Sequence, residues 1–141
     1  RVLDKTGKVV DTIRSVEPFS IEMEYELKAP LPGLRIGLYI TSARGEQVLT
    51  TFDTDDQKRF ENMSSRPAGH YLSRCIIPPD LLNGGRYTLG VNASSFKIRR
   101  YFMEEQSLTF NVDTSGAPGM QWSEPRPGIL RPRFEWNIET K

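Results

Sequence analysis

The residue types that could carry out chemistry are few and scattered in this chain of 141 residues. There is one histidine, His70, and one cysteine, Cys75. These two residues cannot supply the full ligand set of a His/Cys zinc site, and no nucleophile lies at a motif spacing from His70. The sequence also lacks a glycine-rich phosphate loop, a GxSxG elbow and an HExxH pair. We therefore expect no metal and no cofactor, and we interpret His70 as a surface residue at a strand end.

Two groups of carboxylates are the remaining candidates for a metal site or an acid–base pair. One short segment contains Asp53, Asp55, Asp56 and Glu61. It lacks the central glycine and the spacing of an EF-hand loop, so we expect a solvated acidic loop. The other group is Glu22, Glu24 and Glu26, which alternate along one segment and should line one exposed strand face. Glycoside hydrolysis needs carboxylates on opposite sides of a sugar, so the sequence favours a noncatalytic domain.

A basic stretch with interleaved aromatic residues runs from Lys97 to Phe102. Such a combination can hold phosphates and stack bases. However, Glu104 and Glu105 follow at once, and the whole chain has a net charge of only +1. A nucleic-acid partner and a polybasic membrane role are therefore excluded as main functions. We expect a long hairpin loop here, which is still compatible with a phosphate-bearing sugar.

Carbohydrate-binding sites combine aromatic rings with hydrogen-bonding side chains, because sugars offer hydroxyls and weakly apolar C–H faces. Polar residues that alternate with apolar ones in three segments are Arg35, Tyr39, Arg86, Thr88, Asn92, Thr109 and Asn111. They share one face if the strands that contain Ile36, Leu89 and Phe110 are neighbours, as in an immunoglobulin-like sandwich. The alternative is that they merely solvate the sheet between core positions.

Each residue of this face has an expected role if the face binds glycan. Arg35 and Arg86 would contact an anionic cap or hydroxyls, and Asn92 and Asn111 would orient hydroxyls. Tyr39 would supply the stacking ring, because the neighbouring Gly37 leaves a shallow floor beside it.

The elements that must position these residues are strands, because the hydropathy period is two. The clearest run is Phe19–Leu27, and Leu34–Thr41 repeats it after the breaker Pro30-Leu31-Pro32-Gly33, which predicts two adjacent antiparallel strands. Further runs are Val2–Asp4, Val9–Ile13, Gln47–Phe52, Tyr71–Ile77, Tyr87–Val91 and Leu108–Val112. Counted with a last run near Ile129–Trp136, they give about eight short strands and predict an all-β, immunoglobulin-like antiparallel sandwich.

Helical signals are weak, and the chain's end differs in composition. Only Asp55–Asn62 and Pro79–Leu82 could form a turn or two of helix. Residues 80–87 resemble the turn before an F-type strand, after which Tyr87, Leu89 and Val91 should point inward. We interpret residues 1–141 as one domain, in which 113–141 is a linker followed by a C-terminal docking or exchanged strand.

The tail is too apolar to hang free, so it should dock on a sheet edge or on another subunit. The unpaired Cys75 suits a reducing compartment, and the chain has neither a signal peptide nor an apolar run that could span a bilayer. We expect a domain excised from a longer protein.

A more specific pattern lies near the C-terminus. Phe110-Asn111-Val112-Asp113 is followed by Gly116, Trp122, Arg126-Pro127-Gly128-Ile129-Leu130-Arg131-Pro132 and Phe134-Glu135-Trp136. This block resembles the end of the Wzt C-terminal domain, in which an F-x-V strand end precedes a tryptophan and an R-x-G-hydrophobic-hydrophobic-x-P-x-x-x-W block. Matches at the Gly7 turn, at Gly37, at Ile76-Ile77-Pro78 and from Leu82 to Tyr87 extend the similarity over nearly the whole chain.

The resemblance implies a noncatalytic carbohydrate-binding domain, fused after the ATP-binding domain of an ABC transporter that exports O-antigen polysaccharide in lipopolysaccharide biosynthesis. The domain would lie in the cytoplasm at the inner face of the bacterial inner membrane, with the transmembrane transporter subunit as a partner. It would recognise lipid-linked glycan, often at a modified chain end. The resemblance also implies a homodimer that exchanges a terminal strand, and the residues that would pack on the partner are Trp122, Ile129, Leu130, Pro132, Phe134 and Trp136.

Docking of the tail within one chain predicts the same burial as exchange. No fixed sugar-binding motif carries over from the family, so the expected site depends on the strand-face argument. The alternative function is a structural dimerisation module of the transporter ATPase that binds no glycan. A secreted adhesion or enzyme-associated sandwich is disfavoured by the unpaired Cys75 and by the tail.

Overall fold

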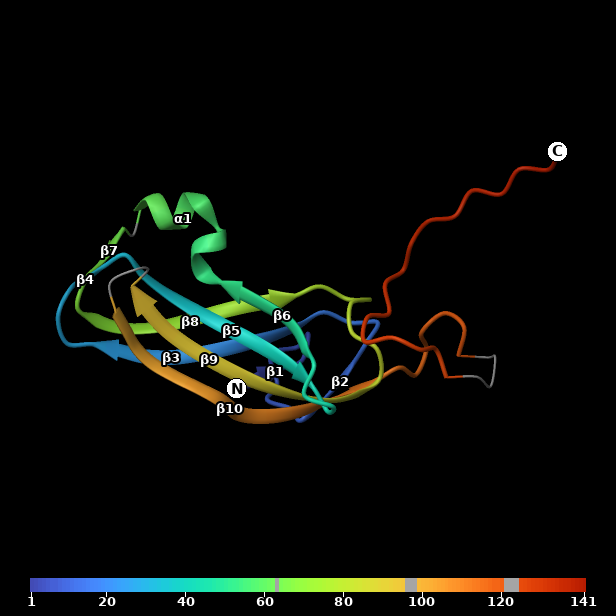
Figure 1. The fold of residues 1–141 in the computed structure, drawn as a ribbon, viewed down its shortest axis with the longest axis horizontal. Coiled ribbons are helices and arrows are strands. Elements are labelled where there is room, and N and C mark those ends of the chain that lie inside the picture. The colour runs from blue at the N-terminus through green and yellow to red at the C-terminus, as the bar shows by residue number, and fades with distance from the viewer. Residues whose placement is uncertain (63, 96–98, 121–124) are drawn as a thin grey trace.

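The computed structural model describes residues 1–62, 64–95, 99–120 and 125–141, and within them two sheets pack face to face (Figure 1). The smaller sheet has the order β1-β3-β8, formed by Val2–Leu3, Phe19–Leu27 and Gly69–Ile77. The larger sheet has the order β2-β10-β9-β5-β6, formed by Thr12–Arg14, Arg99–Asp113, Gly85–Ser95, Leu34–Ser42 and Gln47–Phe52. The predicted all-β sandwich is therefore confirmed.

Three small elements complete the described part of the fold. β4 (Leu31–Pro32) and β7 (Ser65–Arg66) pair as a separate ribbon. A 3₁₀ turn, η1 (Asp53–Asp55), leads into helix α1 (Gln57–Asn62). Asp56 starts this helix, because its Oδ1 accepts a hydrogen bond from the Arg59 backbone N at 3.3 Å. The turn of helix expected in 55–62 is confirmed, whereas residues 79–82 are not helical. No helix in the described residues has the length and apolarity needed to span a membrane.

The predicted pairing of Phe19–Leu27 with Leu34–Thr41 is wrong. β3 pairs with β1 and β8, whereas β5 pairs with β9 and β6. Both strands have one dry face, and the connection through residues 28–33 carries the chain from one sheet to the other. The two dry faces therefore meet across the sandwich rather than side by side.

β9 and β10 extend well beyond the predicted runs. Their antiparallel ladder continues to the pair Arg99 and Ser95, with irregularities after Arg100 and after Glu104. Arg99–Phe102 thus belong to a strand, and the expectation of a loop there is wrong. Lys97 and Ile98 lie outside the described residues. The extra ladder hydrogen bonds explain the extension, since they satisfy backbone groups without needing a period-two pattern.

The core lies between the two sheets and is built around Phe110, which is 1% exposed. Its ring lies 5.6 Å from that of Phe19 in the opposite sheet and 5.7 Å from that of Tyr87 on β9. Tyr87, Leu89 and Val91 are all buried, as predicted. The Tyr87 hydroxyl donates to the Asn83 carbonyl at 2.7 Å, four residues upstream, in the manner of a tyrosine corner. This bond ties the turn before β9 to the core.

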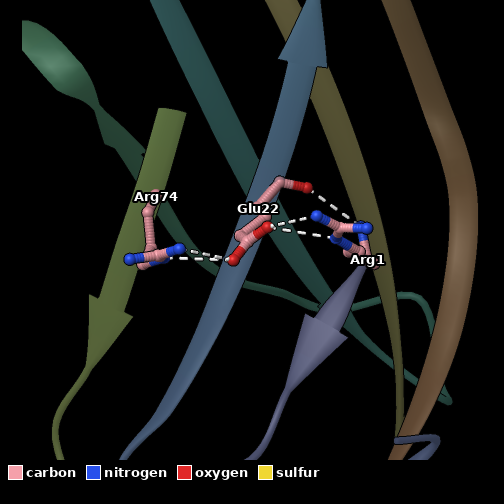
Figure 2. A network of polar contacts seen from close by, with 3 residues as sticks. All are labelled: Arg1, Glu22 and Arg74. Atoms are coloured by element: carbon pink, nitrogen blue, oxygen red, sulfur yellow. Dashed lines mark hydrogen bonds and ion pairs between the residues drawn. The ribbon is translucent and has the colours of Figure 1, made fainter. Parts of the chain in front are cut away.

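The prediction that Glu22 lies on an exposed strand face is wrong, because its side chain is only 3% exposed. Figure 2 shows Glu22 between Arg74 of the neighbouring strand β8 and Arg1, which directly precedes β1. Arg74 of β8 donates through Nη2 at 2.8 Å and Nε at 3.1 Å, and the Arg1 guanidinium donates through Nε at 3.0 Å. Two long arginine side chains cover the carboxylate, so the alternation of polar and apolar residues does not reveal its burial. Glu24 and Glu26 are exposed as expected.

Candidate functional site

The predicted neighbours in the large sheet are neighbours in the structure, since β5, β9 and β10 are consecutive. Tyr39 is opposite Gly90, Arg86 is opposite Asn111 and Thr88 is opposite Thr109. Directly paired residues share a face. The seven residues predicted from the strand alternation therefore lie together on the outer side of this sheet, which we call the outward face: Arg35, Tyr39, Arg86, Thr88, Asn92, Thr109 and Asn111.

One half of the outward face is open and polar. Arg86, Thr109 and Asn111 are exposed, and Thr88 is half-buried between them. Arg86 Nη2 donates to Thr109 Oγ1 at 3.2 Å, which holds the guanidinium along the sheet. This half thus presents hydroxyl, amide and guanidinium groups on a strand surface, which suits hydrogen bonding to a hydroxylated ligand.

The other half is built around Gly37, and the shallow floor expected there is absent. Phe52 of β6 is opposite Gly37, and two of its ring carbons lie 2.7 and 2.9 Å from the position a Cβ of Gly37 would take. The Arg35 guanidinium carbon lies 4.1 Å above the Phe52 ring centroid, and Arg35 Nε donates to Ser94 Oγ at 3.3 Å. The ring and the guanidinium thus fill the space beside the half-buried Tyr39.

The sequence pattern does not place Phe52 on the outward face, and Asn92 is more buried than predicted. An aromatic residue that covers a glycine on the next strand is a known device in sheets, but it can be recognised only once the register is known. Asn92 lies 5% exposed beside Gly37, and its Oδ1 has no hydrogen-bond partner among the described residues. An open acceptor of this kind fits a site that receives a donor from outside the chain.

The expectation of a wholly solvated acidic loop is wrong for Asp53. Its Oδ1 accepts from the Ile36 backbone N at 2.9 Å, and its Oδ2 pairs with Arg66 Nη2 at 2.9 Å. The Arg66 side chain is only 7% exposed and that of Asp53 is 28% exposed, so this ion pair is largely buried. Asp55, Asp56 and Glu61 are exposed as predicted.

His70 and Cys75 differ in their exposure to solvent. His70 lies near the start of β8 with its side chain 82% exposed, which confirms its placement at a strand end. Cys75 is half-buried, and burial together with the charge of Asp55 raises the pKa of its thiol. Its reactive thiolate form is therefore disfavoured at neutral pH. The described residues contain no cluster of three or more His, Cys, Asp or Glu side chains able to hold a metal ion.

Within the described residues the tail makes backbone hydrogen bonds to its own sandwich as far as Arg131, and Arg133 Nε adds an ion pair with Asp80 Oδ2 at 3.6 Å. Asn83 N donates to the Ile129 carbonyl at 2.8 Å, Arg131 N donates to the Leu81 carbonyl at 2.8 Å, and Leu82 bridges Leu130. The expected strand near 129–136 does not form in the described residues, because beyond this bridge no strand of the same chain is paired with it. Ile129 packs against the core, Leu130 is 49% exposed and Pro132 is half-buried.

Beyond Pro132 the tail leaves the sandwich (Figure 1). Phe134, Trp136 and Ile138 are 74%, 83% and 92% exposed, so the described residues leave these side chains largely uncovered. Trp122, the first residue of the expected exchange set, lies outside the described residues.

The same architecture is found in a known protein structure. A crystal structure of the C-terminal domain of Wzt superimposes with a TM-score of 0.76, over 98% of this chain and 80% of that one, at 14% sequence identity. At this identity the likeness shows the fold. No curated protein matches the chain. The family model described as the Wzt C-terminal domain matches residues 1–122, and the chain therefore belongs to the Wzt C-terminal domain family.

Proposed function

We propose that this chain is a noncatalytic domain that recognises O-antigen polysaccharide for export by an ABC transporter. In the parent complex it follows an ATP-binding domain, contacts a transmembrane subunit through that domain and lies at the cytoplasmic side of the inner membrane. The observation that carries the proposal is the outward face, which a member of the Wzt C-terminal domain family presents on three adjacent strands.

The chemistry of this face suits a glycan. Arg86 and Asn111 offer donors and an acceptor at one end, and the half-buried Tyr39 offers a ring at the centre. Arg35 lies over Phe52 with its guanidinium already oriented, so it can bind a hydroxyl pair or an anionic group at a low entropic cost. Thr88 adds a hydroxyl on the neighbouring strand β9, where Asn92 also carries a buried Oδ1 that has no partner among the described residues.

Retention on immobilised O-polysaccharide tests the proposal. The purified domain is passed over the polysaccharide of its own source strain and over that of an unrelated strain, and we expect selective retention of the first. Tyr39→Ala and Arg35→Ala should each weaken retention about tenfold, the scale of losing one aromatic or charge-assisted contact. Arg44→Ala, in the exposed turn between β5 and β6, is the matched control and should bind normally.

A second candidate is a dimerisation module that pairs the fused ATPase and binds no glycan. The exposed Phe134, Trp136 and Ile138 favour self-association, since monomeric proteins rarely leave such a cluster uncovered. We propose that these residues pack on a partner's sandwich by strand exchange, which is compatible with either function. A folded dimer that retains neither polysaccharide would favour the structural module over glycan recognition.

A further inference from the structure

A cavity lies away from the outward face, between the edge strands of the two sheets. β6 ends the larger sheet and β8 ends the smaller one, and α1 lies beside them (Figure 1). The space between these elements, which we call the edge cleft, has a volume of about 600 Å³. This lies within the range of roughly 300–1,000 Å³ that is typical of small-ligand sites.

The polar wall of the edge cleft contains an unsatisfied buried donor. Arg66 donates through Nη1 to the Tyr25 hydroxyl and through Nη2 to Asp53 Oδ2. Tyr25 in turn shares a hydrogen bond of 3.2 Å with Ser73 Oγ. Arg66 Nη2 also contacts the Leu34 carbonyl at 3.5 Å, whereas Arg66 Nε is buried and has no partner among the described residues. Buried donors of this kind are rarely left unpaired, so an oxygen from outside the chain is expected to accept from it.

Aromatic rings line the same cleft. Tyr25 and Tyr71 stack with their ring centroids 5.4 Å apart, and Phe60 of α1 is 37% exposed at the mouth. The ion pair between Arg59 and Asp56 lies beside Phe60, with a separation of 3.4 Å. Ring surfaces, an unpaired guanidinium N–H and hydroxyls around one cavity match the apolar faces and hydroxyl groups of a sugar ring.

The charges of the cleft argue against a purely anionic ligand. Asp53 and Asp56 line it together with Arg59 and Arg66, and each carboxylate is already paired with one of these arginines. A hydroxylated neutral group can both donate to the carboxylates and accept from the guanidinium groups. A free anion could use only the guanidinium groups.

We propose that the edge cleft is a second glycan subsite, which binds a sugar residue through Arg66 Nε, Ser73 and the Phe60 ring. This inference depends on the proposed function and assigns it a further site. Phe52 connects the two places, because it supports Arg35 on the outward face and also lines the edge cleft. A polysaccharide on the outward face can therefore continue around the β6 edge into the cleft.

Retention on the source-strain polysaccharide separates the cleft from the outward face. Phe60→Ala should weaken retention about tenfold, because Phe60 is a partly exposed ring at the mouth whose loss leaves the core intact. Phe102→Ala is the matched control, since Phe102 is 53% exposed and does not line the cleft. Unchanged retention by Phe60→Ala, with a loss in Tyr39→Ala, would overturn the cleft subsite and leave the proposed function standing. No retention by the unsubstituted domain would overturn the proposed function itself.

Arginine Nε–H resonances give a readout that does not depend on substitution. In the unsubstituted domain, titration with oligosaccharide released from the same polysaccharide should shift the Arg66 Nε–H signal. An unmoved Arg66 signal at a saturating concentration, while Arg35 shifts, would contradict binding in the edge cleft.

Discussion

The Glu22 carboxylate, which lies between two guanidinium groups, makes the stability of this fold depend on pH at acidic values. Hydrogen bonds from Arg74 lower the pKa of Glu22 below its ordinary value of 4.5, burial opposes this, and Arg1 lowers it further. The folded state therefore binds the proton more weakly than the unfolded state. The stabilisation from Glu22 is present in full above pH 4.5 and is lost as the pH falls through the lower folded pKa.

We predict that Glu22→Gln is destabilised at neutral pH and loses less stability than the unsubstituted domain on acidification. The substitution leaves two arginines without their shared partner, and the neutral amide does not titrate. Urea unfolding at pH 7 and at a series of values below pH 4.5 measures both effects. Glu24→Gln, on the same strand but exposed, is the control and should follow the unsubstituted curve. Parallel acid profiles for Glu22→Gln and the unsubstituted domain would disprove the role of the ion triad.

At the scale of elements, the turn before β9 is attached to the core by the buried Leu82 and by a side-chain hydrogen bond from Tyr87. The buried Tyr87 hydroxyl donates to the Asn83 carbonyl, and burial raises the pKa of this hydroxyl, so it stays protonated as a donor. The Asn83 side chain also donates to the Arg126 and Gly128 carbonyls, both at 2.7 Å. The turn thus connects the core to the docked part of the tail.

We predict that Tyr87→Phe lowers the free energy of unfolding by about 0.5–1.5 kcal/mol, the usual net contribution of one hydrogen bond. The ring and its packing on Phe110 are kept, so the loss reports the hydroxyl alone. Chemical denaturation measures the change, with Tyr39→Phe as the control, because the Tyr39 hydroxyl has no hydrogen-bond partner among the described residues. Equal stability of Tyr87→Phe and the unsubstituted domain would mean that the corner bond is dispensable.

The elements themselves could be predicted where one dry face alternates with one wet face. β3 and β6 have their predicted bounds, and in β3 every second residue from Phe19 to Leu27 is apolar. The partners of β3 could not be predicted, since Glu22 meets Arg74 52 residues away and many segments share the same alternation.

The residues of the candidate site also differ in whether the sequence could predict them. The outward face follows from alternation plus strand order, so its members could be predicted. Phe52 and Arg66 could not, because the position of Phe52 depends on its register opposite Gly37. Arg66 lies in a strand of two residues, which is too short to show any period.

At the scale of the whole molecule, the tail has two parts with different roles. Up to Arg131 it is attached to its own sandwich, and Arg131 Nη2 donates to the Pro118 carbonyl at 2.8 Å. Beyond Pro132, Arg133 still pairs with Asp80, but the large apolar side chains are left largely uncovered by the described residues. The first part belongs to the fold of the single chain, and the second is available for a partner copy.

We predict that a chain ended after Pro132 keeps its thermal stability and becomes monomeric, whereas the full chain is a dimer. The removed residues include Arg133, whose ion pair with Asp80 is partly exposed to solvent, so their loss should cost the fold little. Light scattering coupled to size exclusion gives the mass of each form, and circular dichroism gives the melting temperature. A shortened chain that still dimerises would show that another surface pairs the copies.

The pairing of β2 with the end of β10 has a mechanical consequence. These two strands run parallel, with Thr12, Ile13 and Arg14 opposite Asn111, Val112 and Asp113. A force that pulls the segment before β2 away from the tail after β10 therefore loads the ladder along its length. Its hydrogen bonds must then break together rather than one by one. Because forced unfolding follows the height of the unfolding barrier, the short ladder resists tension more than its size suggests.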